Sequence, residues 1–169
     1  MFKHQLFEEQ VRLNPDAPAL VSMTQHLTYG ELNQLANATA RRVQRLGAVP
    51  GDIAAVYLRR SVELVVAILA LRKAGVACLH LDPDGSQQQV GGLLKLSEAK
   101  VILTHERHLK ALHVPTAHVV CLDSLRDVIG EAEAGNPEVN LSTHHAESIF
   151  CTSGTTGAPK AVVWNFRRL

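Results

Sequence analysis

One segment near the end of the chain combines glycine, hydroxyl and lysine side chains at close spacing. Residues 152–160 read Thr-Ser-Gly-Thr-Thr-Gly-Ala-Pro-Lys, between two apolar runs at 148–151 and 161–164 that we expect to be strands. The glycines permit positive φ, so successive backbone amides can turn towards one anion. The hydroxyls can donate to phosphate oxygens, and the lysine supplies a positive charge. The residues that we expect to bind a triphosphate are Thr152, Ser153, Gly154, Thr155, Thr156, Gly157 and Lys160.

This segment differs from the common nucleotide-binding loop Gly-x-x-x-x-Gly-Lys-Ser/Thr. Its lysine lies three residues after the second glycine, and an apolar strand, not a helix, is expected to follow it. No helix dipole would therefore face the phosphates. The alternative interpretation is a flexible linker rich in glycine, threonine and serine. The complete nine-residue string favours phosphate binding over a linker.

The elements that must position this segment alternate between apolar runs and helices. Thr28 followed by Glu31 forms a capping-box pattern, which predicts a helix from Tyr29 after a small hairpin. Ser61 can cap a helix that ends at Gly75. The alternation predicts an α/β fold with a mainly parallel sheet flanked by helices. We expect strands at 18–21, 26–29, 53–58, 77–81, 101–104 and 118–121, helices at 1–13, 29–46, 62–74, 87–96, 106–112 and after Asp123, and a solvated connection at 130–146.

Composition excludes several classes of function. Lys and Arg total 17 against 16 for Asp and Glu, so no excess positive charge favours nucleic acid. The most apolar run, 62–71, is about half the length of a membrane span. Cys78, Cys121 and Cys151 lack the short spacings of zinc sites or disulfide frameworks. We therefore expect three buried thiols in a cytoplasmic protein, with no membrane and no nucleic-acid partner.

The string at 152–160 closely resembles the phosphate-binding signature of the adenylate-forming (AMP-binding) superfamily. Leu-Thr-Tyr-Gly-Glu-Leu at 27–32 resembles the first core motif of amino-acid adenylation domains, and 71–77 with 81–83 resembles the second. Residues 6–20 are similar to the usual opening of such domains. The resemblance extends through nearly the whole chain and favours nonribosomal peptide synthetases over acyl-CoA synthetases.

The resemblance implies that residues 1–169 are an incomplete N-terminal adenylation domain, the first portion of a large N-terminal subdomain. The loop would grip the β- and γ-phosphates of ATP while a carboxylate, which we expect to be that of an amino acid, attacks the α-phosphorus. The acyl-adenylate would pass to the phosphopantetheine thiol of a carrier protein. The family's Mg²⁺ ligand, acid pocket and catalytic lysine lie further along than Leu169. We therefore assign no catalytic residue and no metal ligand, and expect this chain alone to be inactive.

Several residues depart from the family pattern. Ala161 and Phe166 replace a glycine and a histidine, while Cys78 and His80 replace a tyrosine and a proline. Residues 84–89 replace a stretch that usually contains tyrosine, proline and arginine. We expect Phe166 to affect the acyl or nucleotide side of the site, and the other changes to affect local packing. The apolar run 161–164 would leave Trp164 exposed without the rest of a full domain.

Two other functions remain as alternatives. The first is a truncated, non-catalytic protein that binds nucleotide or a partner synthetase. The second is another ATP-using enzyme such as a kinase, which would need acidic metal ligands after the loop. Other polar pairs receive structural or solvated roles. These pairs are His105 with His108, His144 with His145, Asp82 with Asp84, and Arg167 with Arg168.

Overall fold

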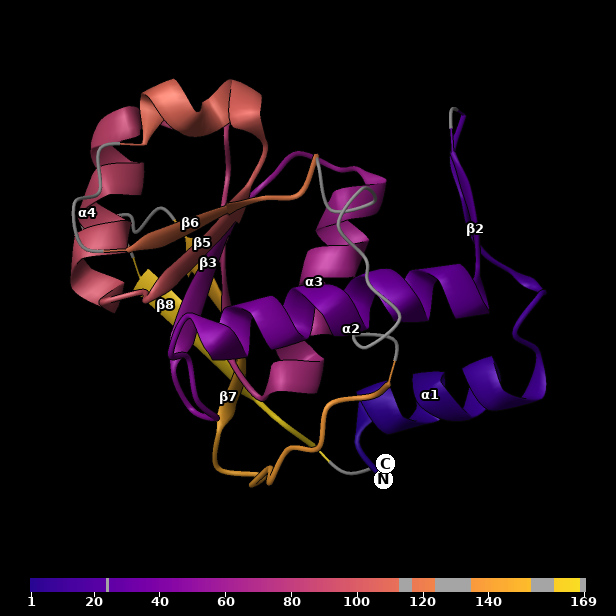
Figure 1. The fold of residues 1–169 in the computed structure, drawn as a ribbon. Coiled ribbons are helices and arrows are strands. Elements are labelled where there is room, and N and C mark those ends of the chain that lie inside the picture. Colours follow the sequence, from indigo (N-terminus) through magenta and orange to yellow (C-terminus); the bar gives the residue numbers. More distant parts are fainter. Residues whose placement is uncertain (24, 113–116, 124–134, 153–159, 168–169) are drawn as a thin grey trace.

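The computed structural model describes residues 1–23, 25–112, 117–123, 135–152 and 160–167 (Figure 1). Its helices are α1 (Lys3–Leu13), α2 (Tyr29–Arg45), α3 (Val62–Ala74), α4 (Gln87–Ser97) and the 3₁₀-helix η1 (Glu106–Ala111). Its strands are β1 (Pro18–Val21), β2 (His26–Thr28), β3 (Ile53–Tyr57), β4 (Ala77–Leu81), β5 (Val101–Thr104), β6 (His118–Cys121), β7 (Ala146–Thr152) and β8 (Lys160–Asn165).

The described strands form two sheets. β1 and β2 make an antiparallel hairpin, as the sequence predicts. The second sheet has the order β6-β5-β3-β4-β7-β8. Its strands pair in parallel from β6 to β7, and β8 runs antiparallel to β7. The predicted α/β fold with a mainly parallel sheet is confirmed.

Helices cover both faces of the larger sheet (Figure 1). α2 and α3 pack on one face, where Ala40, Val43 and Leu71 join strand residues such as Val56 in one apolar cluster. α4 covers the other face through Val90 and Leu94. Alternate residues along each strand point to opposite faces, so the short apolar strands supply both clusters. The layered arrangement leaves the carboxyl ends of the parallel strands at one edge.

Local sequence signals set the limits of α2 and α3. The Thr28 hydroxyl accepts a hydrogen bond from the Glu31 amide at 3.2 Å, and the Glu31 carboxylate accepts from the Thr28 amide at 2.8 Å. The Ser61 hydroxyl accepts from the Leu64 amide at 3.3 Å. Gly75 ends α3 with φ of 72°, a left-handed conformation that glycine adopts without strain. The predicted capping box, cap and stop are therefore confirmed.

Two polar residues of α2 lie inside the protein. Asn33 and Asn37 are both buried. Their side-chain amides donate to the Asn136 side-chain oxygen at 3.1 and 3.0 Å. Buried amides are tolerated when they are hydrogen-bonded, and Asn136 comes from a segment about a hundred residues further along the chain.

Smaller corrections concern the cysteines and the later elements. Cys78 is buried as predicted, but Cys121 and Cys151 are only partly buried. The helix expected at 106–112 is the 3₁₀-helix η1. The helix expected after Asp123 and part of the connection at 130–146 lie outside the described residues.

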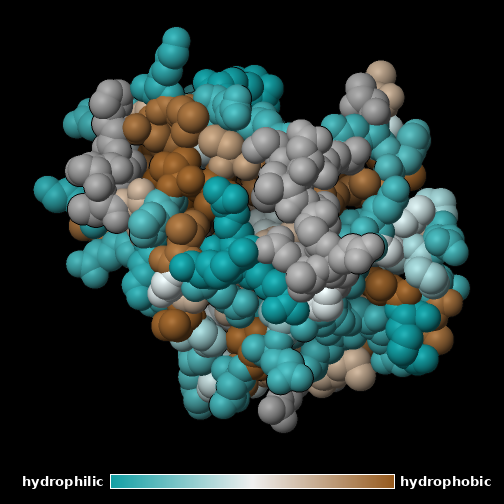
Figure 2. Space-filling model, viewed as in Figure 1, coloured by the Kyte–Doolittle hydropathy of each residue, from teal (hydrophilic) through white to brown (hydrophobic). Residues whose placement is uncertain are grey.

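Strand β8 is the most exposed element of the larger sheet. Val162, Val163 and Trp164 are 44%, 54% and 59% exposed, which confirms the expected exposure of Trp164. On the face shown in Figure 2, hydrophobic surface occurs in separate patches among hydrophilic residues. Within the described part of the chain, no helix is both long enough and apolar enough to cross a membrane.

Candidate phosphate-binding site

The structure fixes the two ends of the predicted phosphate-binding loop. β7 ends at Thr152 and β8 begins at Lys160, and these two residues are register partners in the antiparallel pair. Ser153, Gly154, Thr155, Thr156 and Gly157 lie outside the described residues. The structure therefore places the loop as a hairpin connection and brings together only its first and last predicted ligands.

The hairpin opens at the carboxyl edge of the parallel sheet. β7 is parallel to β4, with Phe150 opposite His80 in the register. The chain therefore leaves β7 after Thr152, next to the carboxyl end of β4. Ligands of open α/β sheets bind outside this edge. Lys160 is exposed there. Because residues two apart share a face, Lys160 shares its face of β8 with Val162 and Trp164.

Three aromatic side chains form a row on that same face. The rings of His80 and Phe150 stack with centroids 4.5 Å apart, and Trp164 contacts Phe150 edge-on at 5.9 Å. Burial, and then the nearby positive charge of Arg72, lower the pKa of His80. A neutral imidazole packs against an aromatic ring without the cost of burying a charge. His80 is therefore a packing residue beneath the loop's exit.

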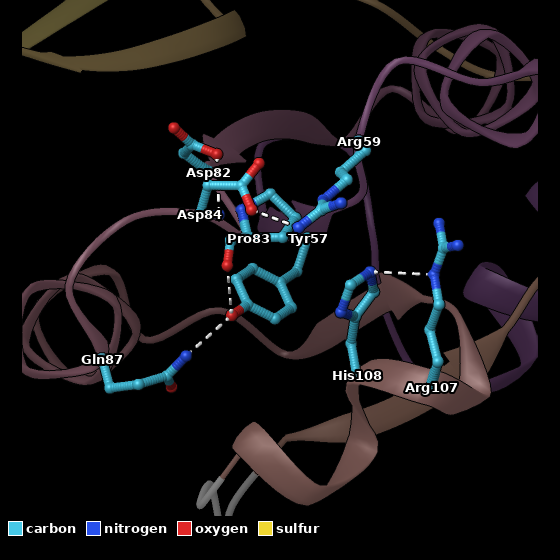
Figure 3. Close-up of polar contacts among 8 residues, drawn as sticks. All are labelled: Tyr57, Arg59, Asp82, Pro83, Asp84, Gln87, Arg107 and His108. Atoms are coloured by element: carbon cyan, nitrogen blue, oxygen red, sulfur yellow. Dashed lines mark hydrogen bonds and ion pairs between the residues drawn. The ribbon is translucent and has the colours of Figure 1, made fainter.

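A hydrogen-bonded turn follows β4 (Figure 3). The Asp82 carboxylate accepts from the Asp84 amide at 2.9 Å, and Asp84 forms an ion pair with Arg59. The buried Tyr57 hydroxyl accepts from the Gln87 side-chain amide at 3.0 Å. These contacts fix the turn between β4 and α4, which agrees with the structural role expected for Asp82 and Asp84.

The histidine pair after β5 gains a partner that sequence spacing did not suggest. His105 and His108 stack with ring centroids 6.2 Å apart. Glu63, at the start of α3, places a carboxylate oxygen 3.5 Å from His105 Nε2. The side chains are distant in sequence, and only the parallel packing of β3 and β5 brings them together. Among the described residues, no group of three His, Cys, Asp or Glu side chains is arranged to hold a metal ion.

The opposite end of the hairpin is anchored by a buried carboxylate. Glu147 is 3% exposed and forms ion pairs with Lys3 at 2.8 Å and Arg72 at 2.7 Å. Phe166, just after β8, is buried and contacts Phe2 edge-on at 6.0 Å. Phe166 thus lies at the end of β8 remote from the loop, where it packs against the N-terminal segment. No sequence motif marked this anchor.

The cysteines are unsuited to nucleophilic chemistry. Burial raises the pKa of Cys78 to about 12, and burial also raises the pKa values of Cys121 and Cys151. The thiolate is the reactive form. The three thiols therefore stay protonated near neutral pH.

The fold and the loop agree with a family match. Residues 7–169 match the model of the AMP-binding enzyme family, and the chain belongs to that family. Within it, the chain is similar to nonribosomal peptide synthetases. It is 39% identical over 160 residues to bacitracin synthase 1 of Bacillus licheniformis, covering 95% of this chain and 3% of that protein. It is 40% identical over 156 residues to surfactin synthase subunit 3 of Bacillus subtilis (strain 168), covering 91% of this chain and 12% of that protein.

Solved structures show the same similarity. The nonribosomal peptide synthetase FmoA3 superposes with a TM-score of 0.88 at 26% identity, covering 99% of this chain and 17% of that one. The N-terminal subdomain of Klebsiella oxytoca NpsA gives a TM-score of 0.81 at 28% identity, covering 96% of this chain and 41% of that one. The chain therefore corresponds to the N-terminal part of an adenylation domain and spans less than half of each of these proteins.

Proposed function

We propose that this chain is part of a cytoplasmic, ATP-dependent enzyme that activates a carboxylic acid as its acyl-adenylate. An amino acid is the favoured substrate, and the thiol of a carrier protein's phosphopantetheine is the favoured acceptor. In this proposal residues 1–169 are an incomplete N-terminal adenylation domain. Its contribution is the loop that binds the phosphates of ATP through Thr152, Ser153, Gly154, Thr155, Thr156, Gly157 and Lys160.

The observation that carries the proposal is the position of the loop's ends. Thr152 and Lys160 are paired at the carboxyl edge of the sheet, which is the edge where open α/β sheets bind ligands. Lys160 is exposed there, so its ammonium group is accessible to a phosphate from solvent. Family membership and the nine-residue string support ATP as the bound triphosphate, which would donate its adenylyl group and release pyrophosphate.

Ligands of a similar protein support the same chemistry. FmoA3 has been solved with AMPPNP bound and with α-methyl-L-serine-AMP bound. The first is a nucleotide triphosphate analogue, and the second joins an amino acid to AMP. By similarity, we infer an amino acid as the acid that the whole protein activates.

The described residues include no group of three His, Cys, Asp or Glu side chains arranged to hold a metal ion, and we expect the Mg²⁺ ligand of the whole enzyme to lie outside this chain. Phosphoryl-site catalysis depends on metal, charge and orientation around the reacting phosphorus. A phosphate-binding loop with one lysine supplies part of that set. We therefore expect the 169-residue chain by itself to show no adenylation.

The test of the loop is Lys160→Ala in the whole adenylating protein. We expect ATP affinity to fall about tenfold or more, because a charge-assisted contact to phosphate is lost, while circular dichroism shows an intact fold. Lys95→Ala is the matched control, since Lys95 is an exposed lysine on α4. Unchanged ATP affinity in Lys160→Ala would remove this lysine from the site.

The alternative is a non-catalytic protein that binds nucleotide or a partner synthetase. The exposed apolar side chains of β8 favour a protein contact at that strand. ATP–pyrophosphate exchange by the whole protein, assayed over a panel of amino acids, separates the possibilities, because exchange supports the adenylating enzyme and no exchange supports the non-catalytic alternative. Exchange by this chain alone would contradict our expectation that catalysis needs further groups.

A further inference from the structure

A second position at the carboxyl edge has the topology of a ligand site. β3 and β5 are neighbours in the sheet. After β3 the chain continues to β4, on the side of β3 away from β5, and after β5 it continues to β6, on the side of β5 away from β3. Ligands of open α/β sheets bind at such a point of reversal. β4 separates this point from β7, the strand that leads into the loop, so β7 lies about 10 Å from β3 at the usual strand spacing.

A hollow with both polar and apolar lining residues lies at this reversal point. It has a volume of about 570 Å³ and lies between the ends of β3 and β5, the start of α3 and the β1–β2 hairpin. Arg60 and Ser61 line it from the segment after β3, and His105 and Arg107 line it from the segment after β5. The volume is within the range of small-molecule sites.

The N-terminus of α3 supplies backbone donors to the hollow. The Ser61 hydroxyl accepts from the Leu64 amide, while the amides of Val62 and Glu63 belong to the first turn and have no acceptor within the helix. α3 has 13 residues, so its dipole adds partial positive charge at this end. Helix N-termini with free amides bind phosphate.

Two arginines add full positive charges. Arg107 Nε donates to His108 Nε2 at 3.3 Å (Figure 3), and Arg107 lines the hollow. Burial first, and then the charges of Arg107, His105 and Arg59, lower the pKa of His108 against the opposing effect of Asp84. His108 therefore stays neutral and accepts this hydrogen bond. Arg60 forms no ion pair with any other described residue.

The one acidic residue that lines the hollow, Glu63, lies next to the buried histidine His105. His105 is 7% exposed, and its Nε2 is buried without a hydrogen bond among the described residues. The Glu63 carboxylate lies 3.5 Å from this nitrogen, so a small movement towards His105 would form the missing hydrogen bond. That movement would draw the acidic charge away from an anion in front of α3. Arg60 and Arg107 would then face the anion.

We propose that the hollow between β3, β5 and the N-terminus of α3 is an anion site that binds the phosphate group of a small molecule. The amides of Val62 and Glu63 bind one side of the phosphate, and Arg60 and Arg107 bind the other. Glu63 turns to His105 when the site fills. This site is separate from the loop that ends at Lys160 and does not depend on the proposed adenylation.

The experiment is a titration of the ¹⁵N-labelled 169-residue chain with inorganic phosphate, followed by NMR. Sodium chloride at equal ionic strength is the reference. We expect saturable shifts of the Val62 and Glu63 amides with phosphate and not with chloride. Arg60→Gln and Arg107→Gln should each weaken binding about tenfold, whereas Arg12→Gln, at an exposed arginine of α1, should leave it unchanged.

Two further comparisons make the outcome decisive. Lys160→Ala should leave the shifts at Val62 and Glu63 intact; if it abolished them, the phosphate would be bound by the loop and this proposal would be wrong. Equal effects of phosphate and chloride, or unchanged binding in both arginine variants, would also overturn it. A titration with glycerol phosphate identifies the source: tighter binding than inorganic phosphate assigns the site to a phosphate monoester, and equal affinity assigns it to free phosphate.

Discussion

Buried charges at single positions join the N-terminal helix to the rest of the molecule. Lys73 on α3 is fully buried and pairs with Glu8 of α1. Its ammonium also donates to the Asn136 side chain at 3.1 Å. Burial lowers the pKa of Lys73, and Glu8 acts in the opposite direction. A buried ammonium is tolerated only when such partners replace water.

At the residue scale, we predict that Glu8→Gln destabilises the protein by about 3 kcal/mol, because it leaves the buried ammonium of Lys73 without a counter-charge. The measurement is urea unfolding at pH 7. Glu9→Gln is the matched control: Glu9 pairs with Arg12 at the surface at 3.4 Å, and its loss should cost about 0.5 kcal/mol or less.

A double variant checks the cause. Lys73→Met combined with Glu8→Leu removes both charges and should recover most of the lost stability. Equal losses of unfolding free energy in Glu8→Gln and Glu9→Gln would show that the buried pair contributes no more to stability than the surface pair.

At the scale of elements, the end of α3 depends on one glycine. Gly75 has φ of 72°, and a Cβ there would lie 2.6 Å from a methyl of Leu141. Gly47, after α2, has φ of 89° with open space around it. The two positions share the same backbone requirement and differ in packing, so they form a natural comparison.

We predict that Gly75→Ala costs more stability than Gly47→Ala. Both variants lose about 1 kcal/mol to a left-handed alanine, and Gly75→Ala adds the collision with Leu141, worth about 1–3 kcal/mol. Thermal and urea unfolding of the two variants give the difference. Equal losses would mean that the segment around Leu141 moves aside freely.

These elements were predictable because their signals are local. Ser61 and Gly75 mark both ends of α3 in the sequence, and the short apolar runs mark the strands. The burial of Asn33, Asn37 and Lys73 was not predictable, since their partners lie far away in sequence. The phosphate-binding loop stays a prediction from its glycines, hydroxyls and lysine, since most of its residues lie outside the described part of the chain. The pairing of Glu63 with His105 could not be predicted from the sequence, because it depends on which strands become neighbours in the sheet.

At the scale of the whole molecule, three histidines make stability depend on pH. Burial lowers the pKa values of His4, His80 and His108. His4 is enclosed on α1 by Glu8, on α3 by Arg72 and Lys73, and on β7 by Glu147. The carboxylates favour its protonation, but burial and the two cations prevail.

We predict that the free energy of unfolding decreases as pH falls from 7 towards 5. The unfolded chain binds protons at these histidines near their ordinary pKa of 6.5, while the folded state binds them only at lower pH. Their contribution is therefore complete above pH 6.5 and is lost as pH falls through the folded pKa values. Urea unfolding at each pH measures the slope.

His4→Gln should reduce this slope, because it removes one of the titrating groups. His26→Gln is the control, since His26 is exposed on β2. A pH profile identical in His4→Gln and the parent chain would contradict the assignment of His4.

The two ends of the described chain lie side by side (Figure 1). The rings of Phe2 and Phe166 are in contact there. The β7–β8 ladder has its outermost pair, Ala146 with Asn165, next to this contact. A mechanical load applied between the two ends would separate the aromatic contact and then open the β7–β8 ladder one residue pair at a time. Hydrogen bonds broken in sequence resist much less force than bonds broken together, so the hairpin that carries the loop would be the first part of the sheet to yield under tension.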